Sequence, residues 1–226
     1  LTAKGQTFTI FNAVVKPKNT ILPLPINIKD GVNYINDNTV TFSFFAPKKS
    51  FIYLVGEFNN WQIDPKFLMN QTPDGERYWL TINNLTKGQE YAYQYLVDGE
   101  IAVADPFTEK ILDPNFDKSI PTNNYPNLRL YPTSNPYGGI VSVLQTAQTP
   151  YNWKVKDFKR PAKEKLVIYE LLVRDFVQSR RYRDVADSLG YLKKLGINAL
   201  ELMPVKEFTA NDSWGYNPIF YTAPDK

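Results

Sequence analysis

Leu166-Val-Ile-Tyr-Glu-Leu-Leu-Val-Arg-Asp-Phe176 is the stretch that decides the fold of the carboxyl-terminal part of this chain. It is rich in Val, Ile, Leu and Tyr and predicts a buried strand. Tyr182 to Leu195 then predicts an amphipathic helix, and Ile197 to Val205 is again mostly apolar. A strand, a helix and a second buried strand in this order predict a β-α-β unit with a parallel sheet.

One face of the predicted helix is apolar. Its apolar residues recur at spacings of three and four, as packing against a sheet requires. Gly196 follows the helix directly and predicts a left-handed C-terminal stop. The residues expected on the buried face are Tyr182, Val185, Ala186, Leu189, Leu192 and Leu195.

The first two thirds of the chain contain short alternating runs of aromatic and β-branched residues, separated by Asn, Asp, Gly and Pro. Asp98-Gly99 predicts a tight turn that leads into a further strand at Ile101 to Ala104, because glycine tolerates a positive φ. Short strands joined by such turns predict a β-sandwich. The strands expected from these runs are Thr39 to Phe45, Phe51 to Val55, Arg77 to Ile82 and Glu90 to Val97.

Three less regular segments complete the predicted organisation. Residues 1–28 form an amino-terminal extension with one alternating stretch, Thr7 to Phe11, and the sandwich follows at 29–108. Prolines recur through 109–165, which predicts an extended surface connector with one short strand at Ile140 to Leu144. The β-α-β segment occupies 166–226.

The composition excludes several classes of function. The chain has 226 residues, no histidine, no cysteine and a formal net charge of +3. Nucleophile systems built on histidine or cysteine, the usual zinc sites and disulfides are therefore excluded within it. Its basic residues are scattered, apart from short groups such as Arg180-Arg181 and Lys193-Lys194, so no nucleic acid is expected as a partner. No apolar run is long enough for membrane insertion.

Leu166 to Phe176, Leu195 to Phe208 and the loop Ser213 to Pro218 closely resemble the opening of the catalytic barrel in the α-amylase family, glycoside hydrolase family 13. The resemblance implies that 166–226 is the truncated start of a (β/α)8 TIM barrel. In that family the acidic catalytic residues lie on later strands. It therefore implies an amino-terminal fragment that has no catalytic residue and is inactive alone.

The loop Ser213-Trp214-Gly215-Tyr216 is the motif nearest the chemistry. In the family, the tyrosine matching Tyr216 stacks under the sugar being cleaved, and we favour that role over simple packing at the barrel rim. Trp214 is a second candidate for substrate binding, but a tryptophan at this place is more often a packing neighbour, and we favour packing for it.

Three further pieces, Val55 to Trp61, Tyr93 to Gly99 and Ala104 to Phe107, resemble the early-set, immunoglobulin-like sandwich classed as carbohydrate-binding module family 48. An indole face suits the apolar face of a glucose ring, and amides bond sugar hydroxyls. The resemblance therefore makes Trp61 and Asn59 candidates for glucan binding.

The alternative role for Trp61 is packing in or beside the sandwich core. Glycogen-binding members of the family carry a second tryptophan after the Asp-Gly turn and a lysine in the strand before it. This chain has Ile101 and Gln94 at those places. Both departures remove contacts to sugar, so we favour packing for Trp61 and expect weak glucan binding or none.

Glu170, Asp175, Glu201 and Glu207 lie on or beside the two predicted barrel strands. A retaining glycosidase needs two carboxyl groups roughly 5 Å apart, but the resemblance places those groups on later strands. It assigns these four acids to structure, in ion pairs with neighbours such as Arg174 and Lys206.

The resemblance implies a parent enzyme that cleaves α-glucosidic bonds in starch, glycogen or maltooligosaccharides by a retaining mechanism, at an extracellular or cell-surface location. The alternatives are a glucan branching enzyme and a non-catalytic glucan-binding module. No cofactor is expected; calcium is common in the family, but no ligand cluster for it is visible in this sequence. An incomplete barrel exposes apolar faces and strand edges, so that part is expected to be poorly ordered, docked on the sandwich, or paired with another copy.

Overall fold

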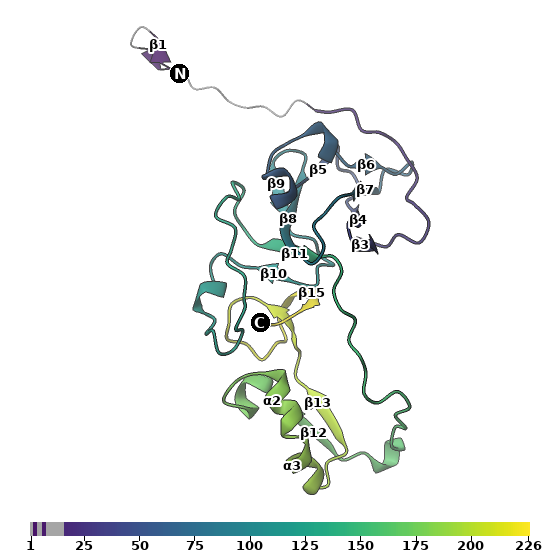
Figure 1. Ribbon diagram of the computed structural model, residues 1–226, viewed down its shortest axis with the longest axis vertical. Coiled ribbons are helices and arrows are strands. Elements are labelled where there is room, and N and C mark those ends of the chain that lie inside the picture. Colours follow the sequence, from purple (N-terminus) through teal and green to yellow (C-terminus); the bar gives the residue numbers. More distant parts are fainter. Residues whose placement is uncertain (1, 4–5, 8–15) are drawn as a thin grey trace.

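The computed structural model describes residues 2–3, 6–7 and 16–226. Figure 1 shows a β-sandwich, the connector that follows it, and a small α/β unit at the far end of the molecule. A two-stranded hairpin, β1 (Thr2–Ala3) with β2 (Gln6–Thr7), precedes the sandwich in sequence. The predicted alternating stretch at Thr7 to Phe11 lies, beyond Thr7, outside the described residues.

Two antiparallel sheets form the sandwich. The first has the order β3-β4-β7-β6. The second has the order β10-β11-β8-β5, and β9 shares one edge of the long strand β8 with β11. The strands of the first sheet are β3 (Gly31–Asn36), β4 (Thr39–Phe45), β7 (Arg77–Ile82) and β6 (Asn70–Gln71). Those of the second are β10 (Ile111–Leu112), β11 (Val141–Gln145), β8 (Glu90–Val97), β5 (Ile52–Gly56) and β9 (Ile101–Val103).

The strand predictions in this region are confirmed. β4, β7 and β8 have the predicted bounds, and β5 is shifted by one residue. Asp98 and Gly99 both have positive φ, 53° and 74°, as the predicted tight turn requires. Because side chains alternate across a strand, one face of each sheet supplies the core between them. There Phe42 meets Tyr93 edge to face, with ring centroids 5.1 Å apart.

The sandwich extends past the predicted boundary at residue 108. β10 and β11 belong to the second sheet, so the sandwich continues to Gln145. The predicted short strand at Ile140 to Leu144 is β11, and it pairs with β8 along 90–93. Prolines between β10 and β11 interrupt regular structure, and the sequence signal for an extended connector therefore obscured the short strand β10.

The connector also forms a third layer. Residues of β5, β8 and β11 that point away from the sandwich core, such as Val55 and Ala92, are fully buried. They are covered by connector side chains, Leu128, Tyr131 and Tyr137. The second sheet is therefore buried on both faces over this region.

The carboxyl-terminal segment contains the predicted β-α-β unit. β12 (Ile168–Leu171) and β13 (Ala199–Leu202) pair in parallel. The predicted strand to Phe176 is wrong beyond Leu171, where one helical turn, α1 (Val173–Phe176), follows. Pro204 has no N–H to donate, and the ladder with β13 ends before it, so β12 has no partner to continue against.

The predicted helix is present in two parts, α2 (Tyr182–Asp187) and α3 (Leu189–Lys194). The Ser188 hydroxyl donates to the carbonyl of Asp184 at 2.8 Å, a back-bond that bends helices. Gly196 has a φ of 87°, which confirms the predicted stop. The predicted apolar face is only partly buried: Val185 and Leu192 are, whereas Leu195 is 57% exposed. The sheet of this unit has two strands, β12 and β13, and it covers only the middle of the apolar face of α2 and α3.

A second hairpin joins this unit to the rest of the molecule. β14 (Lys206–Phe208) and β15 (Pro218–Pro224) are antiparallel, and Phe220 and Ala223 of β15 pack against Ile111 of β10. Of the three expected fates for the partial barrel, this hairpin shows docking on the sandwich. The remaining short 3-10 turns are Glu57–Asn59, Pro65–Phe67, Asp117–Ser119 and Lys163–Lys165. No helix among the described residues is long and apolar enough to cross a membrane.

Candidate functional site

The loop between β14 and β15 presents its aromatic residues to solvent. Trp214 is 65% exposed and Tyr216 is 63% exposed. The Tyr216 hydroxyl donates to a carboxylate oxygen of Glu170 in β12, at 3.2 Å. Desolvation, this hydrogen bond and the charges of Glu170 and Glu201 raise the pKa of Tyr216. The structure therefore brings the favoured candidate of the sequence next to the first barrel strand, with its ring accessible.

Backbone geometry and one arginine fix this loop. Gly215 has a φ of 86°, and a Cβ built there would lie 2.2 Å from the carbonyl oxygen of Pro204. Its N–H donates to the Ser213 hydroxyl at 3.0 Å. The Arg174 guanidinium forms ion pairs with Asp175, at 2.9 Å, and with Asp212. Arg174 thus ties the start of the loop to α1, and only glycine fits at position 215.

The four acids of the partial barrel, Glu170, Asp175, Glu201 and Glu207, were predicted to form ion pairs, and the structure shows this for some of them. The expected pair of Asp175 with Arg174 is present. Glu170 and Glu201 are register partners in the parallel ladder, and Glu170 accepts from Tyr216. Lys206, the second basic neighbour named for these acids, makes no ion pair within residues 16–226. Lys206 lies over the Tyr221 ring, 4.7 Å from its centroid, because the two neighbouring strands place both side chains on one exposed face.

Glu207 instead faces Lys226. The Lys226 ammonium lies 2.9 Å from Glu207 and 2.8 Å from Asp117, and all three side chains are less than 10% exposed. Burial raises the pKa of Glu207 to about 7, despite the opposing effect of Lys226. Burial likewise raises the pKa of Asp225 to about 6. Lys226 therefore forms ion pairs with two acids, Glu207 of the β14–β15 hairpin and Asp117 of the connector, and so joins these two segments.

The structure corrects the place of Trp61 among the sugar-binding candidates. Its side chain is 1% exposed and belongs to the cluster beneath the connector layer. Its carbonyl oxygen accepts from the Tyr137 hydroxyl at 3.2 Å. This is the packing role that the sequence analysis favoured, and a buried indole offers no face to a sugar.

Asn59 also has an internal role. Its side-chain oxygen accepts from the N–H of Gly56 at 2.9 Å, and its amide donates to the carbonyls of Leu54 and Gln62. These bonds hold the turn that follows β5. The amide therefore has little capacity left for a sugar hydroxyl.

Gln94, which stands where glycogen-binding members of the family have a lysine, has a structural role in this chain. It is 1% exposed, and its amide donates to the carbonyls of Gly138 and Ile140, each at 2.9 Å. Its side-chain oxygen accepts from Asn135 at 3.2 Å. Gln94 thus binds the chain's own connector in place of a ligand. Ile101, the other departure, is 57% exposed.

A buried aspartate supports the sandwich from within. Asp105, in the segment Ala104 to Phe107, is fully buried and accepts hydrogen bonds from the hydroxyls of Tyr93 and Tyr95, each at 2.9 Å. Burial raises the pKa of Asp105. Because the two tyrosines satisfy its carboxyl group, Asp105 is explained by structure alone.

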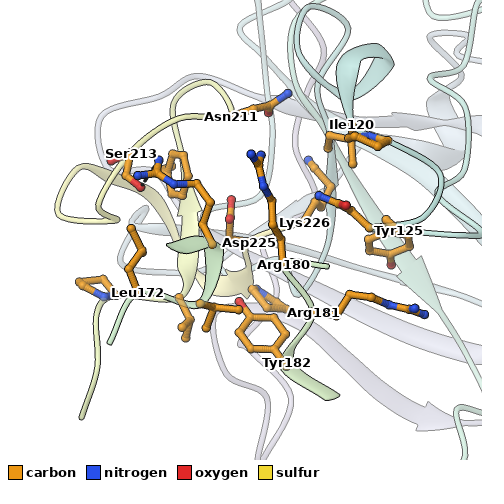
Figure 2. Close-up of a pocket in the computed structure, with 18 of the residues that line it drawn as sticks. Ile120, Tyr125, Leu172, Arg180, Arg181, Tyr182, Asn211, Ser213, Asp225 and Lys226 are labelled. Atoms are coloured by element: carbon orange, nitrogen blue, oxygen red, sulfur yellow. Dashed lines mark hydrogen bonds between the residues drawn. The ribbon is translucent and has the colours of Figure 1, made fainter. Parts of the chain in front are cut away.

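The structure contains a cavity that sequence reasoning did not identify. It has a volume of about 670 Å³ and lies between the connector and the partial barrel. Figure 2 shows side chains from both regions around it, including Tyr125 of the connector, Arg180 and Arg181 before α2, and Tyr182 at the start of α2. The only signal in the sequence was the short basic group Arg180-Arg181, because residues 109–126 and 172–226 meet only in the folded chain. No group of three metal-ligating side chains occurs within residues 2–3, 6–7 and 16–226.

A family model covers the sandwich. Residues 30–111 match carbohydrate-binding module 48, described as the isoamylase N-terminal domain. The match begins just before β3 and ends in β10.

Curated proteins match most of the chain. It is 25% identical over 190 residues to malto-oligosyltrehalose trehalohydrolase of Saccharolobus solfataricus, covering 84% of this chain and 28% of that protein. It is 29% identical over 196 residues to the 1,4-α-glucan branching enzyme GlgB of Photobacterium profundum, covering 82% of this chain and 24% of that enzyme. The chain therefore spans about a quarter of the length of these relatives.

Solved structures share the fold. A putative α-amylase from Salmonella typhimurium superposes with a TM-score of 0.62 at 23% identity, over 87% of this chain and 28% of that one. Pullulanase type I from Bacillus subtilis, complexed with maltose, gives a TM-score of 0.59 at 20% identity, over 89% of this chain and 28% of that one.

Together these findings define a class: an early-set β-sandwich followed by the opening of a TIM barrel, as in enzymes of the α-amylase family. Within that class, residues 30–111 match carbohydrate-binding module 48, and the resemblance to enzymes of glycoside hydrolase family 13 is confirmed.

Proposed function

We propose that the whole protein to which this chain belongs cleaves α-glucosidic bonds in starch-like glucans by a retaining mechanism. The observation that carries the proposal is the order of parts. A carbohydrate-binding module 48 domain precedes a parallel β-α-β unit, and the loop with Trp214 and Tyr216 is exposed in the connection after β13. Loops after the carboxyl ends of barrel strands build active sites.

Tyr216 has the geometry of a sugar platform. Its exposed ring offers an apolar face to a pyranose, while Glu170 holds its hydroxyl and so orients the ring. Trp214 lies two residues away and is equally exposed. In the proposal, these residues position the sugar, and carboxyl groups on other strands of the completed barrel act as nucleophile and acid/base.

The names of the relatives favour one alternative. Photobacterium profundum GlgB is a 1,4-α-glucan branching enzyme, so the second candidate is transfer of a glucan chain in place of hydrolysis. Both reactions proceed through the same covalent intermediate and differ in whether water or a sugar hydroxyl accepts it. A non-catalytic glucan-binding module is the third candidate. The barrel strands make it less favoured, because a binding module does not need them.

The test compares this 226-residue chain with the full-length gene product on soluble starch. Release of reducing sugar by the longer protein alone supports hydrolysis. A fall in iodine staining without reducing sugar supports branching. Inactivity of both proteins favours the binding module, and activity of the chain alone would contradict the proposal.

Glucan binding by the sandwich itself is proposed to be weak or absent. Burial of Trp61 and the engagement of Gln94 by the connector support this. The test is titration of the chain with maltoheptaose and β-cyclodextrin. Saturable binding that is lost in Trp61→Ala without loss of folding would contradict it.

Two further proposals concern the cellular location of the protein and its self-association. An extracellular or cell-surface location is testable by fractionation of the native host. Self-association of this chain through the free edges of β12 and β13 is testable by sedimentation, where a monodisperse monomer would contradict it.

A further inference from the structure

We propose that the cavity between the connector and the partial barrel binds a phosphorylated sugar. This inference goes beyond the proposed function, which concerns neutral glucan at Tyr216, and either can fail without the other. The cavity volume of about 670 Å³ lies in the range of small-molecule sites and exceeds that of a single hexose.

The lining of this cavity is strongly cationic. Three of its cations have carboxylate partners: Lys110 with Glu90, Arg174 with Asp175, and Lys226 with Glu207. In the part of the chain that the structure describes, the guanidinium groups of the other three make no ion pair or hydrogen bond. The basic residues of the lining are Lys110, Arg174, Arg180, Arg181, Arg183 and Lys226, and its acids are Glu109 and Asp225.

Two of these arginines, Arg180 and Arg181, lie where the chain reverses between α1 and α2. Arg180 has a φ of 59°, a left-handed conformation that is uncommon for a residue with a Cβ. Its N–H closes a turn on the carbonyl of Val177 at 3.0 Å, which reverses the chain between α1 and α2. Figure 2 shows Arg180 and Lys226 extending into the same space, with Arg181 below them. Such strain persists where the surrounding structure holds it, often at a ligand site.

The chemistry of the lining selects the ligand. Guanidinium groups recognise phosphate through paired N–H donors, and their charge does not titrate near neutral pH. Around them lie the amide of Asn124, the ring of Tyr125 and the side-chain oxygen of Asn211, whose amide nitrogen already donates to the carbonyl of Phe116 and the hydroxyl of Ser119. Amides bond sugar hydroxyls and an aromatic ring covers a pyranose face. A phosphate group attached to a sugar uses both parts of the site.

The experiment is calorimetric titration of the chain with glucose 6-phosphate, inorganic phosphate and glucose. We expect saturable binding of glucose 6-phosphate, with inorganic phosphate and glucose each at least about tenfold weaker. The variant Arg180→Gln/Arg181→Gln should weaken glucose 6-phosphate binding by about tenfold or more, because each charged hydrogen bond contributes substantially. Both side chains are exposed, so an unchanged urea unfolding midpoint confirms that the variant is folded.

The matched control is Lys193→Gln/Lys194→Gln, which removes the same charge from α3 and does not line the cavity. It should bind glucose 6-phosphate as the parent chain does. An equal loss in the control would indicate general charge attraction and overturn the proposal. Absence of saturable binding, equal binding by the arginine variant, or equal affinity for inorganic phosphate would each overturn it as well.

Discussion

At the scale of single residues, burial separates two aromatic residues that the sequence marks for the same task. Trp61 is 1% exposed beneath the connector, whereas Tyr216 is 63% exposed and tied to Glu170 through its hydroxyl alone. Sugar stacking needs a free ring face, which Tyr216 has and Trp61, buried in the core, does not.

We expect Trp61→Ala to lower the free energy of unfolding by about 3 to 5 kcal/mol, because it empties a fully packed site. Affinity for maltoheptaose should not change. Urea unfolding and titration check the two parts. Trp153→Ala is the control: this indole is 70% exposed, and its loss should change stability by no more than about 0.5 kcal/mol.

We expect the opposite pattern for Tyr216→Ala. The unfolding free energy of the chain should change by no more than about 0.5 kcal/mol, since the side chain is largely exposed. The activity of the full-length protein on starch should fall, while Tyr216→Phe should retain more activity because it keeps the ring. Full activity in Tyr216→Ala would remove this residue from the site.

At the scale of elements, the loop between β14 and β15 depends on one glycine. Gly215 combines a φ of 86° with an approach to Pro204 that leaves no room for a Cβ. The position of Tyr216 is therefore set by backbone geometry as much as by its own contacts.

Gly215→Ala should displace the loop and reduce the activity of the full-length protein on starch, although Tyr216 is retained. Gly190→Ala in α3 is the matched control, because a Cβ there meets nothing within 4 Å. That change should stabilise the helix by about 0.5 to 1 kcal/mol. Urea unfolding and starch assays of both variants test this; equal activities would show that the loop tolerates a left-handed alanine.

Docking of the β14–β15 hairpin should depend on pH. Burial raises the pKa of Glu207 from 4.5 to about 7 and that of Asp225 from 3.8 to about 6. The folded state thus binds more protons than the unfolded state. Their contribution is fully present below the unfolded values and is lost as pH rises through about 6 to 7.

We therefore expect amide exchange in β15 to be slower at about pH 5 than at about pH 8, after correction for intrinsic rates. Glu207→Gln should reduce this pH dependence, since the amide does not titrate. Glu164→Gln, at an exposed position, is the control and should retain it. A pH dependence unchanged in Glu207→Gln would mean that other groups control docking.

At the scale of the whole molecule, the connector is a structural layer. It covers the outer face of the second sheet with Leu128, Tyr131 and Tyr137, and Arg129 pairs with Glu57 and donates to the carbonyl of Glu90 at 2.8 Å. The outer face of the second sheet is therefore occupied by this chain itself.

Gln94→Ala should loosen this layer, because the carbonyls of Gly138 and Ile140 lose their donor. We expect a loss of about 1 to 3 kcal/mol in unfolding free energy and faster protease cleavage within 128–140. Gln148→Ala is the control, since that side chain is exposed and its amide donates to the carbonyl of its near neighbour Gln145. Unchanged cleavage in Gln94→Ala would show that the aromatic contacts suffice.

The sequence by itself determined the local elements and their class. Alternation and turn residues gave the correct bounds for β4, β7 and β8, and the periodicity from Tyr182 with Gly196 gave the helical segment and its end. These features depend on neighbouring residues, so a linear pattern contains them. The same patterns contained the resemblance to the α-amylase family and the motif around Tyr216.

Only the tertiary structure decided which side chains are available. Trp61 is buried because a segment some seventy residues later covers it. Glu207 meets Lys226 and not Lys206, because side chains on successive strand residues point to opposite faces. The cavity with Arg180 exists because the connector and the partial barrel come together. Each of these depends on contacts between distant segments, whose pairing local propensity does not specify.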